Sequence, residues 1–341
     1  MKKFDVIIVG SGPSGLAAAK VFKENNISFC IIEKNKLPRE KLCGGGLTNK
    51  SISLLKKMNF DISKCHAKSI DNVNVCYGKK IKNIKLLNNI VMINRKEFDY
   101  VLLNQVVNDN IFEFESVIDI VGNTLITNKD KYEYKYIVFA DGVNGYSRRL
   151  INNRKFGMCV ECNINIKTSQ TVVDFNIIKN GYGWVFPKKD HTTIGLGNVL
   201  NKRNNYIELI TQFAKINNIK ITQKDIKGFP IPVFSKKVYQ QSVIDNNKIL
   251  VGDAASLVDQ ISGEGIYYAL YSGKLAAESI IHTIKHNYDL KNTYFNKTKP
   301  LYKSLRKRNF CSKLLYSKFS GLFIRIGLSK LLINRIKRIF G

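Results

Sequence analysis

The chain has 341 residues, 44% of them hydrophobic, and can bury a core large enough for two domains or for one α/β domain with an insertion. Its formal net charge is +29, and no Asp or Glu follows Lys291. No nucleic-acid recognition signature accompanies this charge, which argues against a nucleic-acid partner and favours an anionic membrane surface or an acidic protein. No window of about 18 uncharged apolar residues occurs, so we do not expect a membrane-spanning helix.

The seven cysteines are scattered and odd in number, which is unfavourable for a disulfide framework. Cys159 and Cys162 form a CxxC pair, but no second pair and no His follow at the spacing of a zinc site. We expect no metal site, and we expect a cytoplasmic protein in peripheral contact with the inner face of the membrane.

The first residues predict a dinucleotide-binding unit. Residues 3–9 are rich in Val and Ile, as in a strand buried on both faces, and a helix is expected up to about residue 25. A GxGxxG turn joins them. Gly10 permits the tight turn, Gly12 lets the backbone approach a pyrophosphate, and Gly15 lets the helix pack closely on the strand.

The flanks of this turn supply the polar groups. Pro13 and Ser14 open the helix, whose N-terminus offers unpaired N–H groups and a positive dipole end to phosphates. A second strand, 28–32, ends in Glu33, which can accept both hydroxyls of an adenosine ribose. This context makes the glycine motif specific for a dinucleotide.

A glycine run follows at residues 37–46, which read LPREKLCGGG. Three consecutive glycines cannot build a core, but they can admit a planar ring to contact distance. Further on, Tyr182, Trp184 and Phe186 alternate in the segment 181–188 and would share one face of a strand. Such a wall suits an apolar chain, although the same aromatics could be ordinary core of a second domain.

Two later strands end in a carboxylate next to glycine. In the segment 248–255, a strand is followed by Gly252-Asp253, and the segment resembles the ribityl-binding motif of the p-hydroxybenzoate hydroxylase-like flavoproteins. That resemblance implies FAD rather than NAD, with Asp253 on a ribityl hydroxyl. The segment 136–142 ends in Asp141-Gly142, which resembles the start of the DGxxSxxR fingerprint of the same superfamily, with Gly145 where Ser is expected.

A helix is expected from about residue 266 to 282, after a turn rich in glycine. Gly263, Gly265 and Ile266 can lie against a flat ring, and the helix dipole would favour negative charge on a reduced flavin. Ser262 could equally be a plain helix N-cap.

The segments 37–46 and 181–188 together resemble the geranylgeranyl reductase family, in which a PxxKxCGG segment lies over the flavin and a YxWxFPK segment lines the substrate site. The resemblance spans roughly residues 4–285. It implies a set of FAD contacts: Lys41, Cys43, Gly44, Gly46, Arg95, Val117, Asp253, Gly265 and Ile266. Arg95 could alternatively be a solvated residue at a helix start, and Val117 is expected at the end of a strand from Ile111.

The same resemblance implies reduction of isolated double bonds in a polyprenyl chain on a lipid or quinone. A neighbouring acid would have to supply a proton, and Cys43 and then Tyr182 are the candidates. No second GxGxxG unit is present that would indicate a resident NAD(P)H-binding domain. The electron donor would therefore be NAD(P)H that contacts the flavin transiently, or a reduced ferredoxin. The alternatives are an FAD-dependent monooxygenase or halogenase, and a non-catalytic flavin-bound protein at the membrane.

The expected fold is α/β, with a Rossmann-like FAD-binding domain, an antiparallel-sheet substrate domain and a helical C-terminal tail. We assign 1–75, 92–150 and 240–290 to the FAD domain, 76–91 and 151–239 to the substrate domain, and 291–341 to the basic tail. Apolar and basic residues recur near helical spacing over 321–340, which predicts either an interfacial helix or a helix capping the substrate domain.

Overall fold

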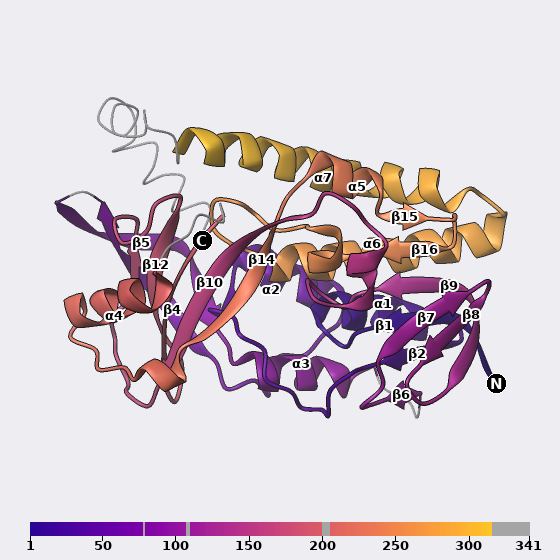
Figure 1. Cartoon of the computed structure of the whole chain (residues 1–341), viewed down its shortest axis with the longest axis horizontal. Helices are drawn as coiled ribbons and strands as arrows, with labels where there is room; N and C mark the ends of the chain where they lie inside the picture. Colours follow the sequence, from indigo (N-terminus) through magenta and orange to yellow (C-terminus); the bar gives the residue numbers. More distant parts are fainter. Residues whose placement is uncertain (78, 107–109, 200–204, 316–341) are drawn as a thin grey trace.

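The computed structural model describes residues 1–77, 79–106, 110–199 and 205–315, and arranges them around two sheets at opposite ends of the molecule (Figure 1). The first sheet has the order β15-β16-β9-β1-β2-β6, and a β7-β8 hairpin joins it at β9. Its strands are β1 (Lys2–Val9), β2 (Phe29–Ile32), β6 (Ile111–Phe112), β7 (Val117–Val121), β8 (Thr124–Thr127), β9 (Lys131–Phe139), β15 (Val243–Ile244) and β16 (Lys248–Leu250).

The centre of this sheet is parallel and covered on both faces, as its sequence predicts. β1 pairs in parallel with β2 and β9, and β9 with β16. Val6 and Ile8 face one hydrophobic core, whereas Ile7 and Val9 face another, so both faces of β1 are buried. This double burial is why the strand lacks polar alternation.

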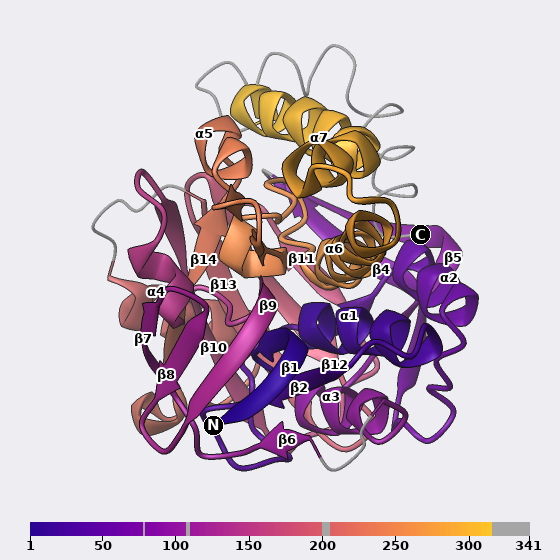
Figure 2. The same cartoon turned by 90° about the vertical axis from the view of Figure 1, so that its right-hand side faces the viewer.

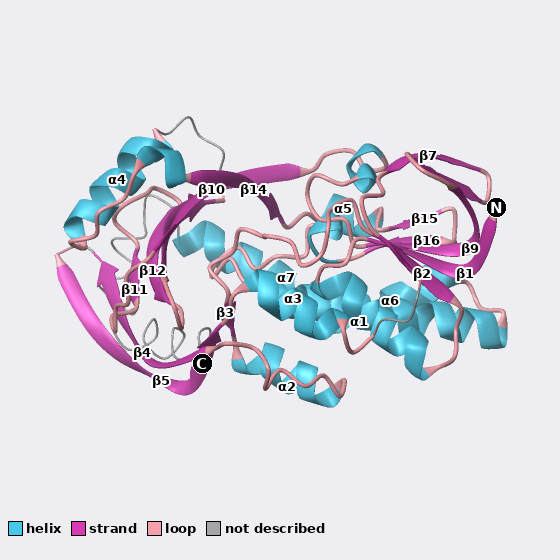
Figure 3. Cartoon of the chain, turned by 90° about the horizontal axis from the view of Figure 1, so that it is seen from below, coloured by secondary structure: helices cyan, strands magenta, loops and turns pink. Residues whose placement is uncertain are grey.

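The second sheet has the order β14-β10-β13-β12-β11-β4-β5-β3 and is antiparallel except between β11 and β4. It curves around one end of the molecule (Figure 3). Its strands are β3 (Gly46–Leu47), β4 (Lys68–Tyr77), β5 (Lys80–Met92), β10 (Lys155–Ile164), β11 (Val172–Asp174), β12 (Gly181–Pro187), β13 (Thr192–Asn198) and β14 (Lys227–Val233).

The boundary expected at residues 75 and 76 does not match this sheet. All of β4 pairs with β5, and the two residues of β3 extend the same sheet. The chain therefore joins the second sheet at Gly46 and again at Lys68. The β4–β5 hairpin belongs to this sheet because β4 pairs with β11 and the inner face of the hairpin is buried there. β10 to β14 all lie within residues 151–239.

Helices cover the sheets and connect them. They are α1 (Pro13–Glu24), α2 (Asn49–Lys57), α3 (Arg95–Leu103), α4 (Tyr206–Ile216), α5 (Lys236–Gln240), α6 (Ile266–His286) and α7 (Leu290–Leu315), with 3-10 turns η1 (Tyr146–Arg149), η2 (Gln223–Asp225) and η3 (Gly252–Ala255). α1 and α6 lie side by side against the first sheet, and α7 packs along α6 (Figure 2). α4 covers the outer face of the second sheet.

The helical start of the basic tail is confirmed, and α7 is part of the fold. Leu301 and Leu305 are buried in the same core as Ile7 of β1. The segment 321–340, for which we expected an interfacial or capping helix, lies outside the described residues. Within the described part of the chain, no helix is long and apolar enough to cross a membrane.

Candidate active site

A cavity of about 930 Å³ lies between the carboxyl ends of the parallel strands and the inner face of the second sheet. Residues from both halves of the fold line it. They include every predicted site residue except Gly15: Gly10, Gly12, Pro13, Ser14, Glu33, Lys41, Cys43, Gly44, Gly46, Arg95, Val117, Asp141, Tyr182, Trp184, Phe186, Asp253, Gly263, Gly265 and Ile266. The fold thus brings together residues from segments that are far apart in the sequence.

The glycine turn after β1 has the geometry that its motif requires. Gly10 has a φ of +100°, and a Cβ there would lie 2.6 Å from the carbonyl oxygen of Ala140. A Cβ on Gly15 would lie 2.1 Å from the carbonyl oxygen of Gly10, so Gly15 serves helix packing rather than the cavity. The space beside Gly12 is open, with its nearest neighbour, an Arg39 nitrogen, 3.6 Å from an added Cβ. The N-terminus of α1 therefore faces the cavity across bare backbone.

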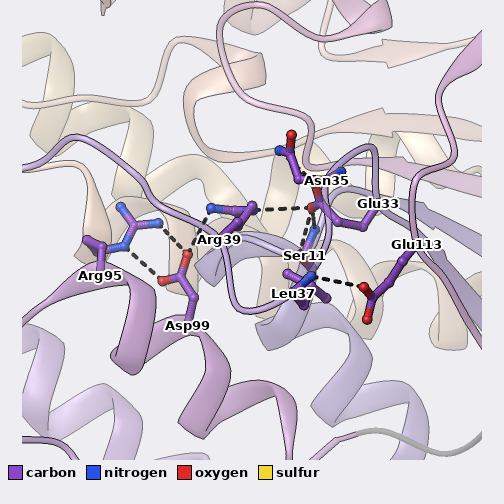
Figure 4. A network of polar contacts seen from close by, with 8 residues as sticks. All are labelled: Ser11, Glu33, Asn35, Leu37, Arg39, Arg95, Asp99 and Glu113. Carbon is purple, nitrogen blue, oxygen red and sulfur yellow. Dashed lines mark hydrogen bonds and ion pairs between the residues drawn. The ribbon is translucent and has the colours of Figure 1, made fainter. Parts of the chain in front are cut away.

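Glu33 is the centre of a polar network at this end of the cavity (Figure 4). Its side chain is 3% exposed and accepts hydrogen bonds from the Ser11 backbone N–H at 3.0 Å and the Ser11 hydroxyl at 2.7 Å. Arg39 lies 3.4 Å from the same carboxylate. Burial alone would raise the pKa of Glu33, but Arg39 and the hydrogen bonds from Ser11 and Asn35 lower it below the ordinary value. Glu33 is therefore ionised at neutral pH.

Arg95 is buried at the start of α3, not solvated. Its Nε and Nη2 donate to the two oxygens of Asp99, each at 2.8 Å, and Arg39 reaches Asp99 at 3.4 Å. Figure 4 shows the resulting chain of alternating charges from Arg95 through Asp99 and Arg39 to Glu33. The bidentate pair fixes the side chains of Arg95 and Asp99, and Arg39 links this pair to Glu33.

Two carboxylates that follow strands, Asp141 and Asp253, line the cavity. Asp141 accepts the Ser147 hydroxyl at 2.6 Å and the Ser147 N–H at 2.8 Å. A Cβ on Gly145 would lie 2.1 Å from Asp141, which explains why a side chain is missing at the position where the fingerprint has Ser. Asp253, in η3, lies near Lys41; burial lowers the pKa of Lys41, and Asp253 opposes that shift.

The strand predicted from Ile111 ends at Phe112, and Val117 opens β7 instead. Val117 still lines the cavity, together with the end of the turn that connects β6 to β7. The CxxC pair is split between two environments, since Cys159 faces the cavity whereas Cys162 belongs to the core under α4. Within the described ranges, no cluster of residues could hold a metal ion.

The aromatic wall is present on β12. Tyr182 and Trp184 are 5.8 Å apart between ring centroids, and Trp184 and Phe186 are 6.2 Å apart. The Tyr182 hydroxyl donates to the carbonyl of Ser262, which ties the second sheet to the loop before α6. Beyond the wall the lining turns apolar, with Val73, Ile90, Met92 and Val173. The cavity therefore has one polar end and one apolar end.

The glycine run after Cys43 crosses between these two ends. A Cβ on Gly44 would lie 3.0 Å from Phe186, and Gly45 has a φ of +73° with Ile93 and Lys188 directly against it. Side chains would fill this space. The polar atoms Trp184 Nε1, Thr171 Oγ1 and Asn198 Nδ2 are buried on the same lining without a hydrogen-bond partner in the described residues, as expected where a ligand completes the site.

Sequence reasoning missed two buried charged groups beneath the glycine run. Glu161 of β10 accepts the Cys43 N–H at 2.7 Å, and Lys188, directly after β12, donates to the carbonyls of Gly44 and, at 2.9 Å, of Ile93. Lys188 stood inside the recognised YxWxFPK segment. The available signal for Glu161 was a single acid between apolar residues, Met158 to Val160 and Cys162, which by itself indicates no function.

The cavity, the bare helix N-terminus, the ionised acid after β2 and the glycine cradle fit a flavin dinucleotide. The fold and the site together define an FAD-dependent oxidoreductase. The family model described as pyridine nucleotide-disulphide oxidoreductase matches residues 4–176, and the chain belongs to this family.

Similar proteins support this assignment. The chain is 33% identical over 301 residues to an uncharacterized protein of Methanosarcina barkeri, covering 84% of this chain and 76% of that one. It is 28% identical to the chloroplastic geranylgeranyl diphosphate reductase of Nicotiana tabacum, covering 81% of this chain and 66% of the relative. The chain thus spans about two thirds of the plant protein. The resemblance to geranylgeranyl reductases is confirmed.

Solved structures share the fold. A geranylgeranyl bacteriochlorophyll reductase-like protein from Thermoplasma acidophilum aligns with a TM-score of 0.76 at 20% identity, covering 100% of this chain and 92% of the other. A flavin-dependent brominase aligns with a TM-score of 0.79 at 17% identity, covering 98% and 94%. At such identities these likenesses establish the architecture alone.

Proposed function

We propose that the protein reduces isolated C=C bonds of a polyprenyl chain carried by a lipid or quinone. One observation carries this proposal: the dinucleotide end of the cavity continues past the aromatic wall into an apolar end lined by β4, β5 and β11. An apolar chain can lie there with its double bond beside the glycine run. Relatives named geranylgeranyl diphosphate reductase and digeranylgeranylglycerophospholipid reductase support a prenylated substrate.

Within this proposal, the chain's own groups hold FAD along the polar end. The N–H groups at the start of α1 bind the diphosphate, Glu33 binds the adenosine ribose and Asp253 binds the ribityl chain. Gly44 and Gly265 lie against the ring. When bound and reduced, FAD supplies a hydride, and so both electrons, to one alkene carbon.

The other alkene carbon needs a proton from the protein or from water. Cys43 is the first candidate, because it stands at the start of the glycine run and its sulfur accepts the Gly45 N–H at 3.3 Å. Tyr182 is the second, since its hydroxyl proton is already donated to Ser262. Such an alkene has no activating carbonyl, so positioning and proton supply must lower much of the barrier.

An anaerobic reaction tests the proposal. The FAD-loaded protein is reduced with dithionite and mixed with a geranylgeranylated lipid or with menaquinone. Reoxidation of the flavin without oxygen, together with a mass gain of two per reduced bond, would support a prenyl reductase. Flavin that stays reduced under nitrogen but yields an oxygenated or halogenated product in air would replace this proposal with the monooxygenase or halogenase. Reduced flavin that reacts with none of the lipids tested would favour the non-catalytic alternative.

Cysteine variants locate the proton donor in the same assay. Cys43→Ser and Cys43→Ala should slow alkene reduction strongly if the thiol is the acid. Cys76→Ser is the matched control, because Cys76 is also half-buried but does not line the cavity. Near-normal reduction by the Cys43 variants would exclude an essential acid at this position and move the role to Tyr182.

The electron donor and the membrane contact are also proposals. NAD(P)H or a reduced ferredoxin would deliver electrons, and the exposed cations of α7, among them Lys299, Lys303 and Lys307, would attract an acidic carrier. Reduction by ferredoxin that slows with added salt would support that carrier. For membrane contact, liposome co-sedimentation should compare the full chain with one ending at Leu315, because an earlier cut would remove the buried Leu301 and Leu305.

A further inference from the structure

The Cys43–Gly44 segment is held from both sides by buried charged groups. On one side, Glu161 Oε1 accepts the N–H of Cys43 at 2.7 Å. On the other, Lys188 Nζ donates to the carbonyl of Gly44 and to that of Ile93. Glu161 is 2% exposed and Lys188 is 4% exposed. Both side chains are therefore shielded from solvent, and both contact this segment.

The surroundings of Glu161 act on its pKa in opposite directions. Burial raises the pKa of Glu161 to about 7, although the Cys43 N–H, Lys188, Lys41 and Arg95 all favour its ionised form. Burial also lowers the pKa of Lys188 to about 8. The second carboxylate oxygen, Oε2, is buried and has no hydrogen-bond partner among the described residues. The carboxyl can therefore take up a proton without breaking another contact.

The charged and titratable groups near Glu161 come from several elements: Lys188 after β12, Lys41 and Cys43 from the loop before β3, Arg95 from α3, Cys159 and Cys162 from its own strand, and the exposed Lys227, its register partner on β14. Lys41 in turn faces Asp253. Lys188, Lys41 and Arg95 favour the carboxylate form of Glu161, and burial opposes it. Since a hydrogen bond to an ionised acceptor is roughly twice as strong as one to a neutral acceptor, protonation of Glu161 weakens its hold on Cys43.

We propose that Glu161 is a positioning residue for the reduction: its carboxylate, opposed by Lys188, holds Cys43 and Gly44 in place at the glycine run, and protonation of Glu161 releases them. We call the contacts of Glu161 with Cys43 and of Lys188 with Gly44 the clamp. Its role in the reduction rests on the function proposed above, whereas the contacts themselves do not. Glu161 acts through the backbone of Cys43 and does not line the cavity.

Hydrogen exchange of the FAD-loaded full chain tests the clamp directly. The readout is protection of the amides in residues 42–47, corrected for the intrinsic pH dependence of exchange, at about pH 6 and about pH 7.5. Over this interval the ratio of ionised to protonated Glu161 rises about thirtyfold. We expect protection in the wild type to rise about fivefold with pH. Deprotonation of Lys188 over the same interval would lower protection, so the sign of the change separates the two groups.

Matched variants complete the test. Glu161→Gln keeps the acceptor and the shape but cannot ionise, and its protection should not rise with pH. Asp174→Asn is the control, because Asp174 is also buried in the second sheet and its carboxylate accepts a backbone N–H, from Asn176 at 2.7 Å, away from the cavity. Asp174→Asn should behave as the wild type does.

Two results would overturn the inference: protection in the wild type that does not rise with pH, or a rise of equal size in Glu161→Gln. The rate of flavin reoxidation by the prenyl substrate is measured alongside and should rise to a plateau above about pH 7 in the wild type but not in Glu161→Gln. If exchange behaves as expected while no prenyl substrate reacts, the clamp stands and the proposed substrate falls.

Discussion

Arg308 of α7 donates to Asp259, a carboxylate that is 0% exposed, and thereby joins the C-terminal helix to the loop that precedes α6. Asp259 also accepts the Ser262 hydroxyl at 2.6 Å and the Ile261 N–H at 3.0 Å. This loop lines the cavity, and Tyr182 bonds to it from the opposite sheet. The basic tail therefore begins as a structural support of the active site.

Arg308→Ala should lower the free energy of unfolding by about 3–5 kcal/mol, because it leaves the buried Asp259 without its cation. The double variant Arg308→Ala, Asp259→Asn should recover part of the loss. Arg306→Ala, on the exposed face of the same helix, should change stability by no more than about 0.5 kcal/mol. Urea titrations of the three proteins measure this, and a double variant as unstable as the single one would contradict the assignment to the ion pair.

Glu33→Gln should weaken FAD binding by about tenfold to a hundredfold, because a charge-assisted hydrogen bond to the ribose is worth about 1.5–3 kcal/mol. Titration of the apoprotein with FAD, followed by flavin fluorescence, measures the dissociation constant. Glu113→Gln is the neighbouring control, since Glu113 accepts the Leu37 N–H at 2.9 Å in the same region but does not line the cavity (Figure 4). Equal effects of both variants would show that loss of local structure, not a ribose contact, weakens binding.

Gly45→Ala should abolish FAD retention and lower the melting temperature. An added Cβ would lie 2.3 Å from the Ile93 carbonyl oxygen and 2.2 Å from Lys188 Nζ, in a backbone with a φ of +73°. Gly122→Ala separates strain from collision, because Gly122 also has a positive φ, +56°, but an added Cβ meets nothing within 4 Å. That control should cost about 1–2 kcal/mol. Retained FAD in Gly45→Ala would show that the glycine run moves freely.

The contribution of Glu161 to the free energy of unfolding should fall as the pH rises toward neutrality. Its pKa is about 7 in the folded protein and near 4.5 when unfolded, so the folded state binds more protons between these values. The stabilising contribution is therefore complete below about pH 4.5 and is lost as the pH rises through 7, with a total of about 3 kcal/mol. The difference in unfolding free energy between wild type and Glu161→Gln, measured from pH 4.5 to 8, should follow this course. A difference that stays constant with pH would contradict the raised pKa.

Local patterns in the sequence predicted the parts of the site that depend on one segment at a time. The run of Val and Ile in β1, the glycines after it and the acid after β2 identify a dinucleotide site because their spacing along the chain determines their geometry. The alternation of Tyr182, Trp184 and Phe186 determined that all three share one face of a strand. The tail from residue 291 was likewise expected to be helical, and α7 confirms its start.

Only the tertiary structure decided which distant groups meet. Glu161 reaches Cys43 across 118 residues of sequence, and Arg308 reaches Asp259 across 49. Ser147, not residue 145, supplies the hydroxyl bound to Asp141. Periodicity reports whether a side chain faces a core, but it carries no information on which buried polar group will lie opposite. That choice follows from how the two sheets pack, where each buried charge must find a partner or shift its pKa.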